Sequence, residues 1–182
     1  MGLRSGAAGY GGVTKALHWL TVLALLAQFT VGYVMDVDDS GRGRGRGRGG
    51  DSAGSGRGRG RGGDEALLDD PGTLLTVHLL LGALILTLAV VRVAWRRFDG
   101  LPPWAEALSP GERRLAHWTE RSLLTLLFVI PVSGAVVLVA DDLVWLHVGA
   151  HLAFFVALAA HVGLVLKHQL GTRDSLLARM LW

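Results

Sequence analysis

Apolar residues in this chain are gathered into four long blocks instead of being spread in an amphipathic pattern. Each block is 18–23 residues long and free of Lys, Arg, Asp and Glu, and the four are Ala16–Met35, Leu74–Val91, Leu123–Ala140 and Val144–Leu166. A transmembrane helix needs about 20 consecutive apolar residues, and a backbone in lipid must pair its own polar groups. The pattern predicts an all-α membrane protein, a bundle of four transmembrane helices forming one domain over residues 1–182.

The segment from residue 36 to residue 71 has a different composition from the apolar blocks. It contains the repeats GRGRGRGRGG and GRGRGRGG, which have no apolar residue to pack a core. We predict a low-complexity, flexible Arg-Gly loop between the first and second helices. Such segments can bind single-stranded nucleic acid, but these repeats lack aromatic residues for stacking, so we expect no nucleic-acid partner.

Shorter signals mark the ends of the helices. Ser109-Pro110-Gly111-Glu112 is typical of a helix start, with serine as N-cap and proline in the first position. Pro131 and Gly134 fall inside the third block, where a kink is tolerated. The first block is too long for a signal-peptide core and no small-x-small cleavage site follows it, so we expect it to be retained. The basic, amphipathic tail over 167–182 is suited to a membrane surface.

Basic residues outside the Arg-Gly loop gather on one side of the predicted membrane. They are Arg4, Lys15, Arg92, Arg96, Arg97, Arg113, Arg114, Lys167, Arg173 and Arg179. The connection between the third and fourth helices carries only Asp141 and Asp142. The positive-inside rule therefore places both termini in the cytoplasm. The Arg-Gly loop opposes this orientation, because its seven arginines lie outside, although eight acidic residues accompany them between Asp36 and Asp70.

Histidines inside the apolar helices are the candidate functional residues, because polar side chains are costly in hydrocarbon. Fourteen residues separate His147 from His161. That spacing is about 40° short of four helical turns and about 21 Å along the axis, so both rings share one face at opposite depths. His18 begins the first helix and His78 begins the second. Depth therefore pairs His18 with His161 on the inner side, and His78 with His147 on the outer side.

Two imidazoles at one depth on facing helices suit haem iron. Zinc or copper would favour three or four ligands at one depth. The chain has no cysteine, which excludes thiolate ligation, iron–sulfur clusters and covalent c-type haem. We predict two b-type haems, an outer one held by His78 and His147 and an inner one held by His18 and His161. With both axial positions filled by protein, electron transfer is favoured over oxygen binding.

Other histidines leave alternatives open. His151 lies one turn from His147 and could replace it as ligand, or could act as a proton-carrying neighbour. We favour His147, because the ten residues from His151 to His161 leave their rings about 80° apart. For His117 and His168, at the inner boundary, a solvated interfacial histidine is the simpler interpretation, and a quinone or haem-propionate contact is the sharper one.

Two arginines near the inner boundary also allow two interpretations. Arg92 and Arg96 could pair with the propionates of the inner haem. They could equally extend to lipid phosphate at the membrane surface.

Short motifs recur through the chain in a fixed order. They are Leu17-His18-Trp19-Leu20, His78 followed by Val90-Val91-Arg92 and Arg96, Leu115-Ala116-His117 fourteen residues before Pro131, then His147, His161 and His168, and finally Arg173-Asp174 and Leu176-Leu177-Ala178-Arg179-Met180. In this order and spacing the chain resembles the bacterial cytochrome b561 family of small four-helix membrane cytochromes. The resemblance covers nearly everything outside residues 36–70.

The resemblance implies two haem b groups with bis-histidine ligation by His18, His78, His147 and His161. It implies a multi-pass protein of the inner (plasma) membrane that exchanges electrons with ubiquinone or menaquinone. Some members are superoxide oxidases, which pass electrons from periplasmic superoxide to ubiquinone. Related cytochromes serve as membrane subunits of hydrogenases and dehydrogenases, so a redox partner subunit is an alternative. This chain departs from the family in its long Arg-Gly loop and its short connection between the third and fourth helices.

The sequence thus predicts a di-haem electron-transfer protein, and it leaves open whether the protein is an enzyme (a superoxide:quinone oxidoreductase) or a carrier. The alternative from another class is a haem-free membrane transporter or scaffold, whose histidines bind protons or metal.

Overall fold

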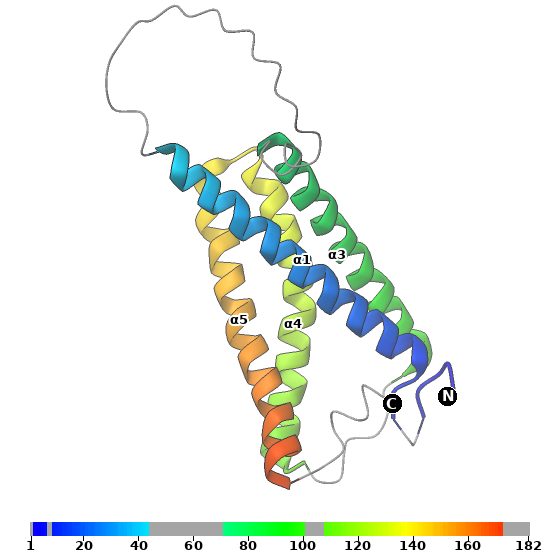
Figure 1. Cartoon of the computed structure of the whole chain (residues 1–182). Coiled ribbons are helices and arrows are strands. Elements are labelled where there is room, and N and C mark those ends of the chain that lie inside the picture. Colours follow the sequence, from blue (N-terminus) through cyan, green and yellow to red (C-terminus); the bar gives the residue numbers. More distant parts are fainter. Residues whose placement is uncertain (1, 7–8, 44–70, 101–107, 173–182) are drawn as a thin grey trace, which may run out of the picture.

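Four long helices make up the protein in the computed structural model, which describes residues 2–6, 9–43, 71–100 and 108–172. No β-strand occurs in those ranges. The helices are α1 (Gly12–Gly43), α3 (Pro71–Asp99), α4 (Pro110–Val137) and α5 (Val144–Lys167), shown in Figure 1. All four are long and apolar enough to cross a membrane. The prediction of an all-α bundle of four transmembrane helices is confirmed.

The boundaries of the first loop differ from the prediction. α1 continues past Met35 to Gly43, so the first part of the predicted Arg-Gly loop is helical. Propagating a helix that has already formed adds a backbone hydrogen bond for each residue fixed, so a helix can outlast its apolar block. Residues 44–70 lie outside the described part of the chain. α3 begins at Pro71, which suits a first turn because its missing N–H would have no partner there.

The start of α4 follows the predicted N-cap pattern. The backbone N–H of Glu112 donates to Ser109 Oγ over 3.4 Å, and the backbone N–H of Ser109 donates to the Glu112 carboxylate over 2.8 Å. This reciprocal pair is a capping box, and Pro110 takes the first helical position. The predicted helix start at Ser109 is confirmed.

The helices pack as two pairs. α1 lies mainly along α3, and α4 lies mainly along α5, whereas contacts between the pairs are sparser. We call the end where α1 and α4 begin the terminal end, and the opposite end the loop end (Figure 1). A short 3-10 turn, η1 (Asp141–Leu143), joins α4 to α5 at the loop end. A π-helical turn, η2 (His168–Thr172), continues α5 at the terminal end, and the rest of the predicted surface-lying tail falls outside the described residues.

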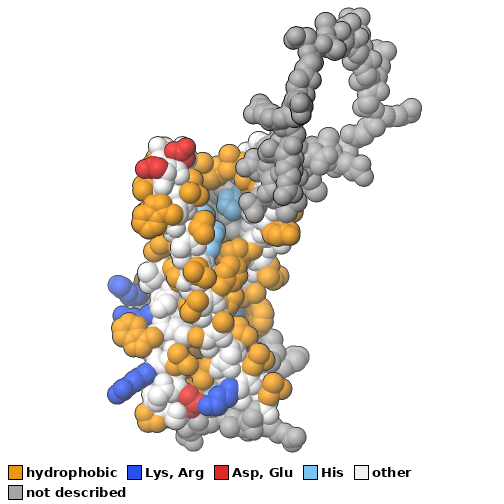
Figure 2. Space-filling view, turned by 90° about the vertical axis from the view of Figure 1, so that its left-hand side faces the viewer, with side chains coloured by type: hydrophobic (Ala, Val, Ile, Leu, Met, Phe, Trp, Pro, Cys, Tyr) orange, Lys and Arg blue, Asp and Glu red, His pale blue; other side chains and the backbone are white. Residues whose placement is uncertain are grey.

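Most apolar side chains point outward. Leu23, Leu80 and Val156 are each more than 60% exposed, while the buried core is limited to small clusters such as Ala24, Ile85, Ala89 and Leu127. Figure 2 shows hydrophobic side chains over the whole middle of one face, with acidic side chains at the loop end and basic ones toward the terminal end. An apolar surface this large is suited to lipid.

Polar contacts close the terminal end. The Asp99 carboxylate accepts hydrogen bonds from the backbone N–H of Ser5 (3.0 Å), the hydroxyl of Ser5 (2.6 Å) and the hydroxyl of Thr14 (3.2 Å). These bonds tie the end of α3 to the start of α1. They hold the first residues of the chain against the bundle.

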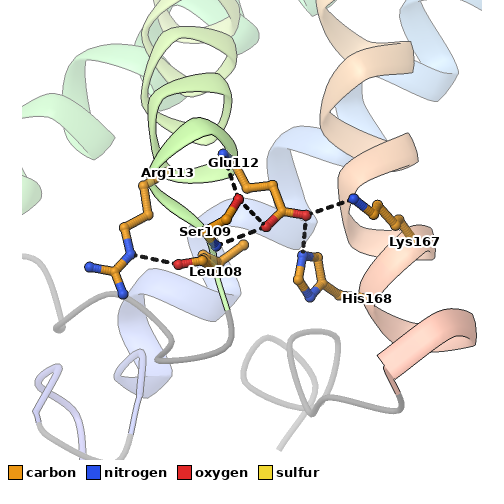
Figure 3. Close-up of polar contacts among 6 residues, drawn as sticks. All are labelled: Leu108, Ser109, Glu112, Arg113, Lys167 and His168. Carbon is orange, nitrogen blue, oxygen red and sulfur yellow. Dashed lines mark hydrogen bonds and ion pairs between the residues drawn. The ribbon is translucent and has the colours of Figure 1, made fainter.

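A second polar cluster joins α4 to the end of α5 (Figure 3). Glu112 Oε1 lies 2.9 Å from Lys167 Nζ and 3.1 Å from His168 Nε2. His168 is only 2% exposed, so its interpretation as a solvated interfacial histidine is wrong. The ring is buried against a carboxylate instead. His117 keeps an interfacial setting, with Arg121 Nη1 donating to its Nε2 over 3.2 Å.

Replacing Ser109 with alanine removes the N-cap and breaks the capping box. We expect the Ser109→Ala protein to lose about 1 kcal/mol of stability. The measurement is unfolding in detergent followed by circular dichroism. The matched control is Thr87→Ala, because the exposed Thr87 hydroxyl only bonds the carbonyl of Ala83 in its own helix. Equal losses in the two variants would contradict the capping role.

Candidate cofactor sites

Five of the six histidines on the long helices fall into two groups, one in each half of the bundle. His18 on α1 and His161 on α5 line one cavity in the terminal half. In the loop half, the ring centroids of His147 and His151 on α5 lie 4.3 Å apart, and His78 on α3 interacts electrostatically with both. The structure therefore brings together the members of both predicted pairs. In each pair, one histidine comes from the α1–α3 pair of helices and the other from the α4–α5 pair.

The cavity in the terminal half has an empty volume of about 600 Å³, including space open at its mouth. Its walls are mainly apolar and come from α1, α4 and α5, with residues such as Val22, Leu25, Leu127, Phe154 and Leu158. The two imidazoles are among its few polar groups. A concave, mostly apolar space with a few convergent polar groups is typical of a cofactor site.

Three charged residues, Arg92, Arg96 and Glu120, also line this cavity. Arg96 Nη1 donates to Glu120 Oε1 over 2.6 Å, and its Nη2 donates to Oε2 over 3.4 Å. Arg92 Nη1 donates to His18 Nδ1 over 3.4 Å. Both arginines therefore face the cavity, and their pairing with haem propionates stays a prediction. Extension to lipid phosphate does not describe Arg96, whose guanidinium is held by Glu120.

A second pocket, with an empty volume of about 460 Å³, adjoins the cavity at the terminal end. It shares Arg92, Arg96 and Glu120 with the cavity, and its remaining walls include Tyr10 and Trp95. The three charged residues thus form a partition between two spaces.

Two buried polar atoms in the loop half lack partners. Gln28 Nε2 lies 3.0 Å from His78 Nε2. Within the described ranges, no hydrogen-bond partner is found for Gln28 Oε1 or His78 Nδ1, although both atoms are buried. Unpaired buried polar atoms are rare, and each one calls for an explanation such as a missing ligand group. The sequence placed Gln28 in mid-membrane but offered no sign that it would meet His78.

His147 is held more closely by α4. Its Nδ1 lies 3.0 Å from Ser133 Oγ, and Ser133 Oγ lies 2.9 Å from the Ile130 carbonyl oxygen. A Cβ on Gly134 would stand 3.0 Å from His147 Cε1, a tight contact that would require the ring to shift by a few tenths of an ångström. Gly134 was predicted only as a site where a kink is tolerated. Its place beneath His147 depends on how α4 packs on α5, which the sequence alone does not specify.

His151 has looser surroundings. Its ring centroid is 4.3 Å from that of His147 and 5.5 Å from that of Phe29. No hydrogen bond to His151 is found among the described residues. Figure 2 shows histidine side chains visible from outside in a recess of the loop half. In the described ranges, no three or more His, Asp or Glu side chains lie together in a way that could hold a metal ion on their own.

Aromatic rings fill the space between the two halves. Phe154 is 2% exposed, and its ring centroid lies 5.7 Å from that of Phe29. The ring centroid of Phe29 lies 4.9 Å from that of Phe155. Phe154 sits midway between His147 and His161 in sequence, and it also lines the terminal cavity. The two sites are therefore separated by packed side chains.

Comparison with known proteins agrees with this arrangement at the level of the family. No curated protein matches the sequence significantly. The family model described as prokaryotic cytochrome b561 matches residues 9–182, essentially the whole chain. The chain therefore belongs to the prokaryotic cytochrome b561 family, and it is a multi-pass plasma-membrane protein of the haem b electron-transfer class.

Proposed function

We propose that this protein holds two haem b groups, one between His18 and His161 and the other between His78 and His147, and exchanges electrons with the quinone pool. One observation carries the proposal: two histidine pairs, each shared between the two helix pairs, lie in opposite halves of a membrane-spanning bundle. Haem b with two imidazole ligands supplies reversible one-electron exchange without an open coordination position.

The residues around both pairs fit a haem. In the terminal half, the apolar walls of the cavity would suit a porphyrin ring, and Arg92 and Arg96 could bind its anionic propionates. In the loop half, the unpaired Nδ1 of His78 and Oε1 of Gln28 leave hydrogen-bonding capacity for a bound group. The absence of a side chain at Gly134 leaves room for the ring of His147.

The pocket beside Arg92, Arg96 and Glu120 supports the quinone part of the proposal. It combines aromatic walls, from Tyr10 and Trp95, with charged groups that could hydrogen-bond quinone oxygens. Its shared wall with the terminal cavity would put a quinone ring beside the site of His18 and His161. Under the predicted orientation, with both termini in the cytoplasm, this is the cytoplasmic side.

The recess in the loop half supports superoxide as the electron donor from the other side. Histidine side chains are visible there from outside the bundle (Figure 2). Under the predicted orientation this half lies toward the outer side of the membrane, from which a small anionic donor would approach. The alternative within the same class is a cytochrome b subunit that receives its electrons from a hydrogenase or dehydrogenase partner.

Substituting alanine singly at His18, His78, His147 or His161 should remove one haem of two, because each iron loses one of its two protein ligands. Haem content per chain is measured as the pyridine haemochrome of purified protein. His151→Ala is the matched control and should keep both haems. Less than about one haem per wild-type chain would favour the haem-free transporter or scaffold.

A methyl group at Gly134 should displace the ring of His147 and lower the haem content of the loop-half site. Gly149→Ala is the matched control, because a Cβ at Gly149 on α5 meets nothing within 4 Å. We expect Gly134→Ala to bind about one haem and Gly149→Ala to bind two, with unchanged helix content in both. Two tightly bound haems in Gly134→Ala would count against His147 as a ligand.

Superoxide and a quinone separate the enzyme from the carrier. If the protein is a superoxide:quinone oxidoreductase, pulses of superoxide should reduce its haems, and added ubiquinone should reoxidise them. The signal is the α-band absorbance in a stopped-flow experiment, with superoxide dismutase added to the control. Haems that ignore superoxide but exchange electrons with quinol would indicate the partner-subunit alternative.

A further inference from the structure

Ser133 Oγ contacts two groups, and these contacts fix the direction of both hydrogen bonds. The hydroxyl has one proton to donate. The Ile130 carbonyl, 2.9 Å away, can only accept, so Ser133 donates to it. The lone pairs of Oγ then face Nδ1 of His147 at 3.0 Å, and a hydrogen bond there requires Nδ1 to carry the proton.

This hydrogen-bond pattern selects one tautomer of His147. With the proton on Nδ1, a neutral imidazole presents a lone pair on Nε2, the form that binds a metal ion. A hydrogen bond donated by the other ring nitrogen orients a ligand and raises its basicity. Gly134 contributes by leaving the space next to Ser133 in which the ring lies.

His151, the neighbour of His147, and His18, in the other half of the bundle, have no equivalent arrangement. His151 is within 4.3 Å of His147, ring to ring, but no hydrogen bond fixes its tautomer among the described residues. In the terminal half, His18 Nδ1 accepts from the cationic Arg92 instead of donating to an oxygen. Among these three histidines, only His147 has a partner that prepares Nε2 for iron.

We propose that Ser133 is a positioning residue that selects His147 over His151 as the ligand of the loop-half haem and lowers the reduction potential of that haem. The proposal rests on the proposed function. A more basic ligand stabilises the ferric state relative to the ferrous state, which is why the potential falls. The hydroxyl acts only through His147 and has no direct contact with the iron in this scheme.

The test uses the haem-loaded protein with Ser133→Ala, Ser133→Thr and Thr119→Ala. Thr119 is the matched control, because it lies on the same helix and its hydroxyl bonds the carbonyls of Leu115 and Ala116. Midpoint potentials of both haems are measured by spectroelectrochemistry. We expect Ser133→Ala to retain two haems and to shift the reduction equilibrium of one toward the ferrous form by about tenfold, which is about 59 mV for one electron.

The Thr variant should restore the original potential, because its hydroxyl can bond the same carbonyl and accept from Nδ1. Thr119→Ala should leave both potentials unchanged. Unaltered potentials in Ser133→Ala would overturn the proposal. A protein that keeps both haems as His147→Ala but loses one as His151→Ala would overturn it too.

A second measurement needs no haem and keeps this proposal separate from the proposed function. Nitrogen chemical shifts of ¹⁵N-histidine in haem-free protein in detergent report which ring nitrogen carries the proton. We expect the Nδ1–H form for His147 in the wild type and its loss in Ser133→Ala. An Nε2–H form of His147 in the wild type would overturn the proposal even if two haems bind, whereas a wild type without haem would overturn the proposed function instead.

Discussion

The cost of placing imidazoles in hydrocarbon is the constraint on which the rest of the structure depends. A polar group buried without a hydrogen bond loses about 2–7 kcal/mol relative to water, and the bundle buries several. Each histidine in a predicted pair is therefore met by a group from a neighbouring helix or by a cavity. Gln28 meets His78, Ser133 meets His147, and Arg92 meets His18.

The bundle and the pairing by depth could be predicted from the sequence because both follow from regular geometry. An apolar block of about 20 residues spans a bilayer as a helix, and a 14-residue spacing returns close to the same face whatever surrounds it. The membrane span ends at Met35 as predicted, but the helix continues to Gly43, because hydropathy marks where lipid contact ends and not where backbone hydrogen bonds end. Local chemistry was sufficient for the N-cap at Ser109, since its partner is only three residues away.

The details of the sites could not be predicted because they depend on the rotation of one helix against another. Ser133 and Gly134 are unremarkable within α4, and they matter only because α5 brings His147 onto them. His168 looked like a solvated residue at the end of an apolar block. The π-helical turn that continues α5 brings His168 against Glu112. The amino-acid composition of a segment does not predict a turn of this kind.

α5 carries one histidine of each pair, and this has a consequence for how the protein can vary. The axial rise of one continuous helix, α5, sets the separation of the two sites, and no loop contributes to it. Changes in length at either end of the bundle therefore leave that separation untouched. A bundle built in this way can carry a long segment between its first two helices, as this chain does, without a change in the separation of the two histidine groups. Because this spacing is set within α5, the loops and the chain ends can vary without altering it.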